Sequence, residues 1–241
     1  MYSVALYSLA AGGITLVGTL LVLRYEGFVK KYAKYLLSFA AGVMLATSFM
    51  HLLPEAAEAA NAAVFPWALA GFAAFYVIEN FVMFHPCVDE HCELHRLGII
   101  SFIGLFVHSL LDGVAIAVGF AVGSGVGFFT AVSVILHELP EGISISGILS
   151  HAGESRKKIL ALSSLVALAT PAGAITFRLL APNFGEYALA VLLSVTAGSF
   201  IYIAATDLIP AAHKKNNRLI TLAFFAGALL VAVGGLMLNG H

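Results

Sequence analysis

The sequence predicts an all-α integral membrane protein, a bundle of eight transmembrane helices with no separate soluble domain. Hydrophobic residues make up 61% of the 241 residues and charged residues only 10%, and the mean hydropathy is +0.98. Apolar stretches of about 20 residues, the length that crosses a bilayer core of about 30 Å, recur along the whole chain. We therefore interpret residues 1–241 as one polytopic domain.

The eight predicted segments follow one another with short connections. They cover residues 2–23, 34–54, 64–84, 98–122, 125–149, 158–180, 187–210 and 219–238. The first segment is not typical of a cleaved signal peptide, because no positive charge precedes it and its apolar run is too long. We expect it to remain in the protein as a helix of the bundle.

Basic residues gather on one side of the predicted bundle. The connections after the first, third, fifth and seventh segments contain eleven of the twelve: Arg24, Lys30, Lys31, Lys34, Arg96, Arg156, Lys157, Lys158, Lys214, Lys215 and Arg218. The positive-inside rule places these connections in the cytoplasm and both termini outside it, in a plasma or inner membrane. Cys87 and Cys92 then lie on the cytoplasmic side, where a structural disulfide is not expected.

Two short runs of ionisable residues interrupt the apolar segments. The fourth segment contains His108-Ser-Leu-Leu-Asp112-Gly, and the fifth contains His137-Glu-Leu-Pro-Glu141-Gly. A histidine and a carboxylate four residues apart share one face of a helix. Ionisable groups at bilayer depth are costly and mark ion or proton paths. If the two faces meet, the four side chains form a cage that suits zinc, iron(II), manganese, cobalt or cadmium.

Three neighbouring residues extend this hypothesis. Ser109 and Glu138 are positioned to hold a second ion beside the first, and Met44, near the centre of the second segment, would add a soft thioether ligand. Three alternatives stay open at this stage. The ionisable groups can form hydrogen-bonded pairs that hold helices together, or a proton relay without metal, and Met44 can be ordinary packing.

Acidic and histidine side chains near the segment ends predict a path for cations. His51, Glu55 and Glu58 at the outer end of the second segment indicate an entrance, although a solvated helix end explains them as well. Asp207 near the inner end of the seventh segment, with His213 just beyond it, indicates an exit.

The connection at about 85–97 has a different character. It concentrates residues of metal-binding type, namely His85, Cys87, His91, Cys92 and His95. Their spacing is not that of a closed zinc finger, so we interpret the stretch as a transient cytoplasmic metal acceptor or sensor. The alternative is an ordinary polar loop.

Sequence echoes predict an inverted repeat. The fourth and fifth segments share their motif, and His51-Leu-Leu-Pro in the second segment resembles Asp207-Leu-Ile-Pro in the seventh. Each pair of segments crosses the membrane in opposite directions. Segments one to three therefore mirror segments six to eight around the central pair, a plan that recurs in transporters with a site near the midplane.

At these residues the chain resembles the ZIP (Zrt/Irt-like protein) family of divalent metal transporters. His137, Glu138, Pro140, Glu141 and Gly142 all match the helix-five motif of the family, whereas Ser109 replaces the asparagine of the helix-four motif. The resemblance implies a carrier that moves zinc or a related metal toward the cytoplasm through an inverted-repeat bundle with an elevator-like movement. It also implies a homodimer in the bilayer.

The same resemblance implies roles for single residues. It supports Met44 as a ligand and places Glu58 at an acidic outer entrance and Asp207 on an inner release path. Because the helix-five motif is complete and the helix-four motif is not, we expect one strong metal site rather than two.

Other function classes rank below a carrier. An intramembrane metallohydrolase with Glu138 as general base lacks the second histidine of H-E-x-x-H, since Glu141 stands there. A metal-selective channel needs weaker binding than a carboxylate cage provides. No G-x-x-x-x-G-K-[ST] loop is present, so we do not expect ATP as a partner. We also expect no nucleic-acid partner, and we expect divalent metal as a substrate rather than as a cofactor.

Overall fold

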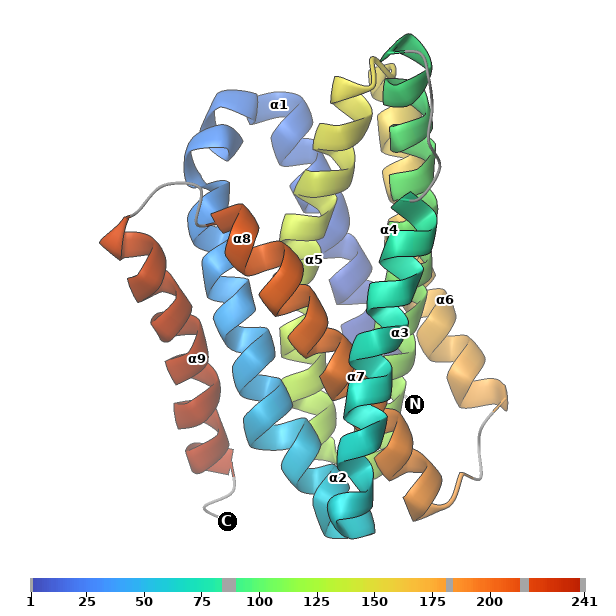
Figure 1. The fold of residues 1–241 in the computed structure, drawn as a ribbon, viewed down its shortest axis with the longest axis vertical. Coiled ribbons are helices and arrows are strands. Elements are labelled where there is room, and N and C mark those ends of the chain that lie inside the picture. The colour runs from blue at the N-terminus through green and yellow to red at the C-terminus, as the bar shows by residue number, and fades with distance from the viewer. Residues whose placement is uncertain (1, 84–89, 181–183, 213–216, 239–241) are drawn as a thin grey trace.

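A computed structural model describes residues 2–83, 90–180, 184–212 and 217–238. Within these ranges the chain forms helices joined by short connections, and no β-strand occurs (Figure 1). The all-helical fold class is thereby confirmed.

The helices match the predicted segments closely. In chain order they are α1 (Tyr2–Thr47), the π-helical turn η1 (Ser48–Leu52), α2 (Leu53–Ala60), the 3₁₀ turn η2 (Asn61–Val64), α3 (Phe65–Met83), α4 (Glu90–Val122), α5 (Ser124–His151), α6 (Arg156–Leu180), α7 (Glu186–Ile203), the π-helical turn η3 (Ala204–Leu208), α8 (Ile209–Ala212) and α9 (Arg218–Leu238).

Helix α1 covers the first predicted segment, the connection after it and most of the second segment. Its backbone leaves helical geometry at Tyr25 (φ −134°, ψ 50°), and Figure 1 shows it rise, cross the top of the bundle and descend. We call residues 2–24 its first arm and residues 26–47 its second arm. The predicted loop at 24–33 is thus mostly helical, since this polar stretch contains no proline to prevent it.

Seven helical stretches among the described residues are long and apolar enough to cross a membrane. One of them, Lys31–Ile78, takes in most of the second and third predicted segments. Within it the backbone leaves helical geometry at Ala60 (φ −136°, ψ 13°) and Asn61 (φ 55°, ψ −151°). The chain is therefore a multi-pass integral membrane protein, and the count of eight crossings stays a prediction.

A single residue, Gly123, connects α4 to α5. Its amide nitrogen lies 3.0 Å from the carbonyl oxygen of Gly119, and the amide nitrogen of Gly127 lies 2.9 Å from the carbonyl oxygen of Gly123. The two helices that contain the ionisable runs are consequently adjacent in the chain and packed together.

Reciprocal glycines let four pairs of helices pack backbone against backbone. A Cβ on any of these glycines would meet the backbone of the facing helix: Gly18 and Gly142 between α1 and α5, Gly113 and Gly173 between α4 and α6, Gly42 and Gly227 between α1 and α9, and Gly71 and Gly198 between α3 and α7. Small residues at such crossings allow the van der Waals contact that drives helix association in lipid.

These contacts repeat between the two halves of the chain. The first arm of α1 packs on α5 as α6 packs on α4, and the second arm packs on α9 as α7 packs on α3. The spacing from Gly42 to Gly198 equals that from Gly71 to Gly227. In Figure 1 the first arm of α1 rises whereas α6 descends, so the halves are inverted. This is the arrangement that the sequence echoes predict.

The two π-helical turns occupy equivalent places in the repeat. Each precedes a proline, Pro54 after η1 and Pro210 after η3. A proline has no N–H for the carbonyl four residues earlier, and a π turn is one way for a helix to absorb that lost bond. The helical path is therefore wider at η1 and at η3 than in the α-helices on either side.

We predict that Gly42→Ala destabilises the protein by about 1–3 kcal/mol, because the added methyl must push two helix backbones apart. The thermal midpoint in detergent measures the effect. Gly13→Ala is the matched control, since nothing lies within 4 Å of a Cβ placed there. Equal midpoints for the two variants would show that the close packing is not needed.

Candidate metal site

Four ionisable side chains meet between α4 and α5. His108, Asp112, His137 and Glu141 each offer a ligand atom, and these atoms lie within 4.8 Å of one another. Asp112, His137 and Glu141 are buried, and His108 is half-buried. We call these four residues the metal cluster. The structure thus brings together the two helix faces that the sequence predicts.

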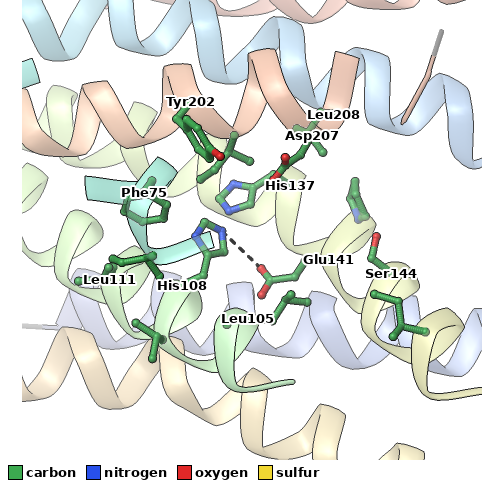
Figure 2. A pocket seen from close by; sticks show the side chains of 16 residues that line it. Phe75, Leu105, His108, Leu111, His137, Glu141, Ser144, Tyr202, Asp207 and Leu208 are labelled. Carbon is green, nitrogen blue, oxygen red and sulfur yellow. Dashed lines mark ion pairs between the residues drawn. The ribbon is translucent and has the colours of Figure 1, made fainter. Parts of the chain in front are cut away.

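Asp112 is the centre of the metal cluster. Its Oδ2 lies 3.1 Å from Nε2 of His108 and 3.1 Å from Nε2 of His137. The same His108 nitrogen lies 3.9 Å from Oε2 of Glu141, the ion pair drawn in Figure 2. Two imidazoles and two carboxylates therefore point at one small volume.

The hydrogen bonds of His137 fix which of its nitrogens faces this volume. Nδ1 lies 2.9 Å from the carbonyl oxygen of Ser133, which can only accept, so Nδ1 bears the proton. In the neutral imidazole Nε2 then directs a lone pair at the carboxylate of Asp112. Two acceptors at 3.1 Å repel unless a proton or a cation lies between or beside them. A backbone carbonyl that holds the far nitrogen is also how metal-ligating histidines are oriented.

Glu141 has one oxygen satisfied and one oxygen exposed to the cluster. Ser109 donates a hydrogen bond of 2.8 Å to Oε1. Among the described residues, Oε2 has no hydrogen-bond partner although it is buried. An unpartnered carboxylate oxygen is costly in a low-dielectric site, and a cation is the partner that would remove the cost. The donor set therefore fits a divalent ion.

Glu138 points away from the metal cluster although it is adjacent to His137. Its carboxylate is completely buried and accepts hydrogen bonds from Thr15 on α1 and from Thr170 on α6, the latter at 2.6 Å. The predicted second site would use Ser109 and Glu138. In this structure Ser109 donates to Glu141, and Glu138 accepts from Thr15 and Thr170. The second site stays a prediction.

A cavity of about 300 Å³ extends from the metal cluster to one side of the bundle (Figure 2). His108, His137 and Glu141 line its inner end, and Ser144 and Asp207 lie further along it. Its walls come from α3, α4, α5, α7 and η3, and it extends toward the ends of these helices where the basic connections lie. Asp207, predicted as an exit residue, thus shares a cavity with the cluster.

The opposite side has a separate hollow of about 370 Å³. Glu55 and Glu58, both predicted entrance residues, line it together with Glu186 at the start of α7. Leu193 also lines it and is completely buried, as are Ile116 and Phe200 in the same apolar cluster. Buried apolar side chains therefore separate the acidic hollow from the metal cluster.

Two predicted residues lie elsewhere in the core. The His51 ring stacks on Phe129 at 3.8 Å, and a Cβ on Gly235 of α9 would meet it, so His51 does not line the acidic hollow. Met44 is completely buried in the apolar cluster that includes Phe200, whose ring lies 5.8 Å from the ring of His137. The structure places Met44 in the packed core.

Part of the predicted metal-binding connection cannot be placed. His85 and Cys87 of that connection lie outside the described residues, as does His213, which was predicted at the exit beside Asp207. His91, Cys92 and His95 belong to the first turns of α4, because that helix begins at Glu90, inside the stretch 85–97 predicted as a loop. Their side chains also lie outside what the structure describes.

Known proteins with similar sequences are zinc transporters, which agrees with the presence of a metal cluster. The sequence profile described as ZIP zinc transporter matches residues 1–90 and 85–235. The chain belongs to the ZIP zinc transporter family. Zinc transporter ZupT of Chlorobium limicola is 30% identical, with 98% of each chain aligned. ZupT of Chlorobium luteolum is 28% identical over 97% of each chain. Zinc transporter ZIP13 of Pongo abelii is 30% identical over 77% of this chain and 60% of its own length.

Family membership decides between two of the function classes. All these relatives are named as transporters, and they align with this chain across the two ionisable runs. The ZIP family chain is therefore a membrane transporter rather than the metallohydrolase considered as an alternative.

Sequence reasoning missed three residues that the structure brings into play. Thr15 and Thr170 look like helix packing in sequence, since a threonine in an apolar helix usually bonds its own backbone. The sequence did contain one indication of their role, because Thr15 and Thr170 occupy equivalent positions in the two halves of the inverted repeat. Glu186 was given no role from the sequence, because its position beside the same hollow as Glu55 depends on tertiary packing.

We predict that Asp112→Asn weakens Zn²⁺ binding by more than about 100-fold, because it removes the charge that both imidazoles face. A chelator competition titration in detergent measures the dissociation constant. Glu154→Gln is the matched carboxylate-to-amide control, since Glu154 pairs with Lys158 outside the site. Equal affinities would remove Asp112 from the ligand set.

Ser109→Ala should weaken Zn²⁺ binding by about tenfold, because Glu141 loses the donor that orients it. The same titration applies. Ser164→Ala is the control, since that hydroxyl donates to Leu160 of its own helix at 2.7 Å. A loss as large as that of Asp112→Asn would make Ser109 a direct ligand.

Proposed function

We propose that this ZIP family chain is a carrier for divalent transition-metal ions, with Zn²⁺ as the leading substrate. The observation that supports it most is the metal cluster. The neutral form of His137 directs a lone pair at the Asp112 carboxylate, and one buried oxygen of Glu141 has no hydrogen-bond partner among the described residues. Both contacts become favourable when a cation binds.

The donor set favours zinc over the hard cations. Two imidazole nitrogens and two carboxylate oxygens are ligands that zinc takes in four-coordinate sites, whereas Ca²⁺ and Mg²⁺ prefer oxygen alone. Fe²⁺, Mn²⁺, Co²⁺ and Cd²⁺ accept the same donors. The names of the relatives, all zinc transporters, support the same choice.

The unequal access on the two sides supports a carrier rather than a channel. The cavity reaches the metal cluster from the side of the basic connections, which the positive-inside rule assigns to the cytoplasm. On the other side apolar packing separates the cluster from the acidic hollow. A channel needs a continuous path, whereas a carrier opens one side at a time.

The inverted repeat identifies the contact that must open on the outer side. Thr47 and Ser133 share a hydrogen bond between their buried hydroxyl groups. Thr47 is equivalent to Ile203, because their spacing equals that from Gly42 to Gly198. Ser133 is equivalent to Gly104, because their spacing equals that between the two metal motifs, from His108 to His137. Ile203 and Gly104 both line the open inner cavity. We infer that the Thr47–Ser133 contact separates when metal enters.

A further group of buried apolar side chains lies on the helices that form this contact and on α9. Val43 and Ala46 of α1, Phe129 of α5 and Val231 of α9 form one buried cluster, and the ring of His51 stacks on Phe129. In the proposed direction of transport, metal attracted by the acidic hollow crosses the apolar packing between the hollow and the metal cluster and leaves past Asp207 into the cytoplasm. Both termini then lie outside the cytoplasm.

The homodimer implied by the family resemblance remains part of the proposal. Mass measurement of the purified chain in nanodiscs tests it, and a mass of one chain per disc would contradict it. The metal cluster lies within one chain, so transport by an isolated chain is compatible with the geometry.

We predict that proteoliposomes containing the protein take up Zn²⁺ without nucleotide, and that His137→Ala lowers the initial rate by more than about 100-fold. A zinc-sensitive dye inside the vesicles records the rate. Glu141→Gln provides a second variant of nearly unchanged volume, and Glu154→Gln is the control. Uptake by His137→Ala and Glu141→Gln at the rate of the control would refute the proposed function.

A cross-linking experiment tests the outer contact. In a background with Cys87→Ser and Cys92→Ser, oxidation of Thr47→Cys/Ser133→Cys should stop uptake, and reduction should restore it. The reason is that a disulfide holds the outer side closed. Each single cysteine variant serves as a control. Full uptake by the oxidised double variant would show that the contact need not open.

A further inference from the structure

We propose that Glu138 is a positioning residue, held between Thr15 and Thr170, that joins two close-packed helix pairs around the metal cluster. It is not a metal ligand, and the chain binds a single ion at this centre. The inference rests on the proposed transport function and assigns roles to three residues of that site. We call these three residues the hydroxyl–carboxylate clip.

The clip uses both oxygens of one buried carboxylate. Thr15 donates to Oε2 from α1, and Thr170 donates to Oε1 at 2.6 Å from α6. All three side chains are completely buried. A carboxylate inside a membrane protein is stable only with donors of this kind, and hydrogen bonds to a charged group are about twice as strong as neutral ones.

Each threonine lies where two helix backbones come closest. A Cβ on Gly142 of α5 would meet the backbone of Thr15, and a Cβ on Gly113 of α4 would meet the backbone of Thr170. These glycines end the two ionisable runs. The clip therefore connects the α1–α5 crossing to the α4–α6 crossing directly behind the residues that form the metal cluster.

The inverted repeat makes the two threonines equivalent. The spacing from Thr15 to Thr170 equals that from Gly18 to Gly173. Glu138 receives both equivalent donors, so it lies where the two halves of the bundle meet. Its own equivalent on α4 is Ser109, which instead donates to Glu141. A single acidic residue thus serves both halves.

The hydroxyl–carboxylate clip fixes the rotation of α5 about its own axis. Successive residues of a helix point about 100° apart, so Glu138 and His137 face different neighbours. With Glu138 fixed between α1 and α6, His137 and Glu141 are turned toward Asp112. Loss of the clip lets α5 rotate or shift, and ligands displaced by about 1 Å bind and release metal less efficiently.

The same contacts argue against a second ion at Glu138. An ion would have to displace at least one threonine hydroxyl, which would then be buried without an acceptor for its proton. Ser109, the other residue predicted for that site, offers a neutral hydroxyl and is already bonded to Glu141. In the metal cluster, by contrast, Oε2 of Glu141 has no hydrogen-bond partner among the described residues.

The test compares uptake rate and bound metal in a set of clip variants. Thr15→Val and Thr170→Val remove a hydroxyl at nearly constant volume, Thr15→Ser and Thr170→Ser keep it, and Glu138→Ala removes the acceptor. Thr130→Val is the matched control, because that buried hydroxyl donates to Val126 of its own helix at 2.8 Å. Equilibrium dialysis with ⁶⁵Zn²⁺ measures the ions bound per chain.

We expect each valine variant to lower the uptake rate by about tenfold and each serine variant to stay within about twofold of the unmodified protein. In the Glu138→Ala background, Thr15→Val should lower the rate by less than about twofold more, because the acceptor is already gone. Every variant should bind one Zn²⁺ per chain.

Three results would each overturn the inference. They are two bound ions in the unmodified protein with one in Glu138→Ala, valine variants that match Thr130→Val, and losses that multiply in the double variant. These results are separate from failure of the proposed function, which would appear as an unmodified protein that neither binds nor takes up Zn²⁺.

Discussion

The whole structure depends on how a membrane protein accommodates charge where no water can solvate it. The carboxylate of Asp112 is surrounded by two imidazoles, those of His108 and His137, each 3.1 Å from its Oδ2. Pairing of this sort offsets the desolvation of the carboxylate only in part, because the neutral form of His137 presents a lone pair rather than a proton. The remaining imbalance is what makes the cluster suited to a cation. A cluster whose charges and hydrogen-bonding atoms were all paired with one another would bind a cation only weakly.

Close packing of the helices at reciprocal glycines is the second condition for forming the site. Reciprocal glycines bring α1 onto α5 and α4 onto α6, so that the residues next to them are held by backbone rather than by long side chains. Lipid gives no hydrophobic driving force between helices, so close van der Waals contact must supply the cohesion. The result is a rigid frame in which short side chains such as those of Thr15 and Ser109 can reach a carboxylate.

Hydropathy and helical spacing predicted most of the fold and the centre of the site. Most segment ends agree with the helices within a few residues, although α4 begins at Glu90 rather than at residue 98 and the second segment is divided among α1, η1 and α2. The four-residue spacing of His108 with Asp112 was enough to place both on one face. The errors have local causes. Charge at 24–33 suggested a loop, whereas charged residues without proline form helix as readily at a membrane surface.

The remaining differences come from contacts that no single helix determines. His51 was assigned to the entrance with Glu55, yet η1 changes the helical register between them, and the ring of His51 stacks on Phe129 instead. Glu138 was grouped with the ligands because it is adjacent to His137. Its partners lie 123 and 32 residues away in sequence, on α1 and α6, so periodicity on α5 alone could not identify them.

The one-residue connection at Gly123 has a consequence for how the site is assembled. All four residues of the metal cluster belong to α4 and α5, and a single residue separates those helices. Closing so short a loop costs little conformational entropy, and contacts that are local in sequence form early. The charges that would be most costly in lipid can therefore neutralise one another within one helical hairpin. Their burial does not have to wait for α6, α7 and α9 to be synthesised.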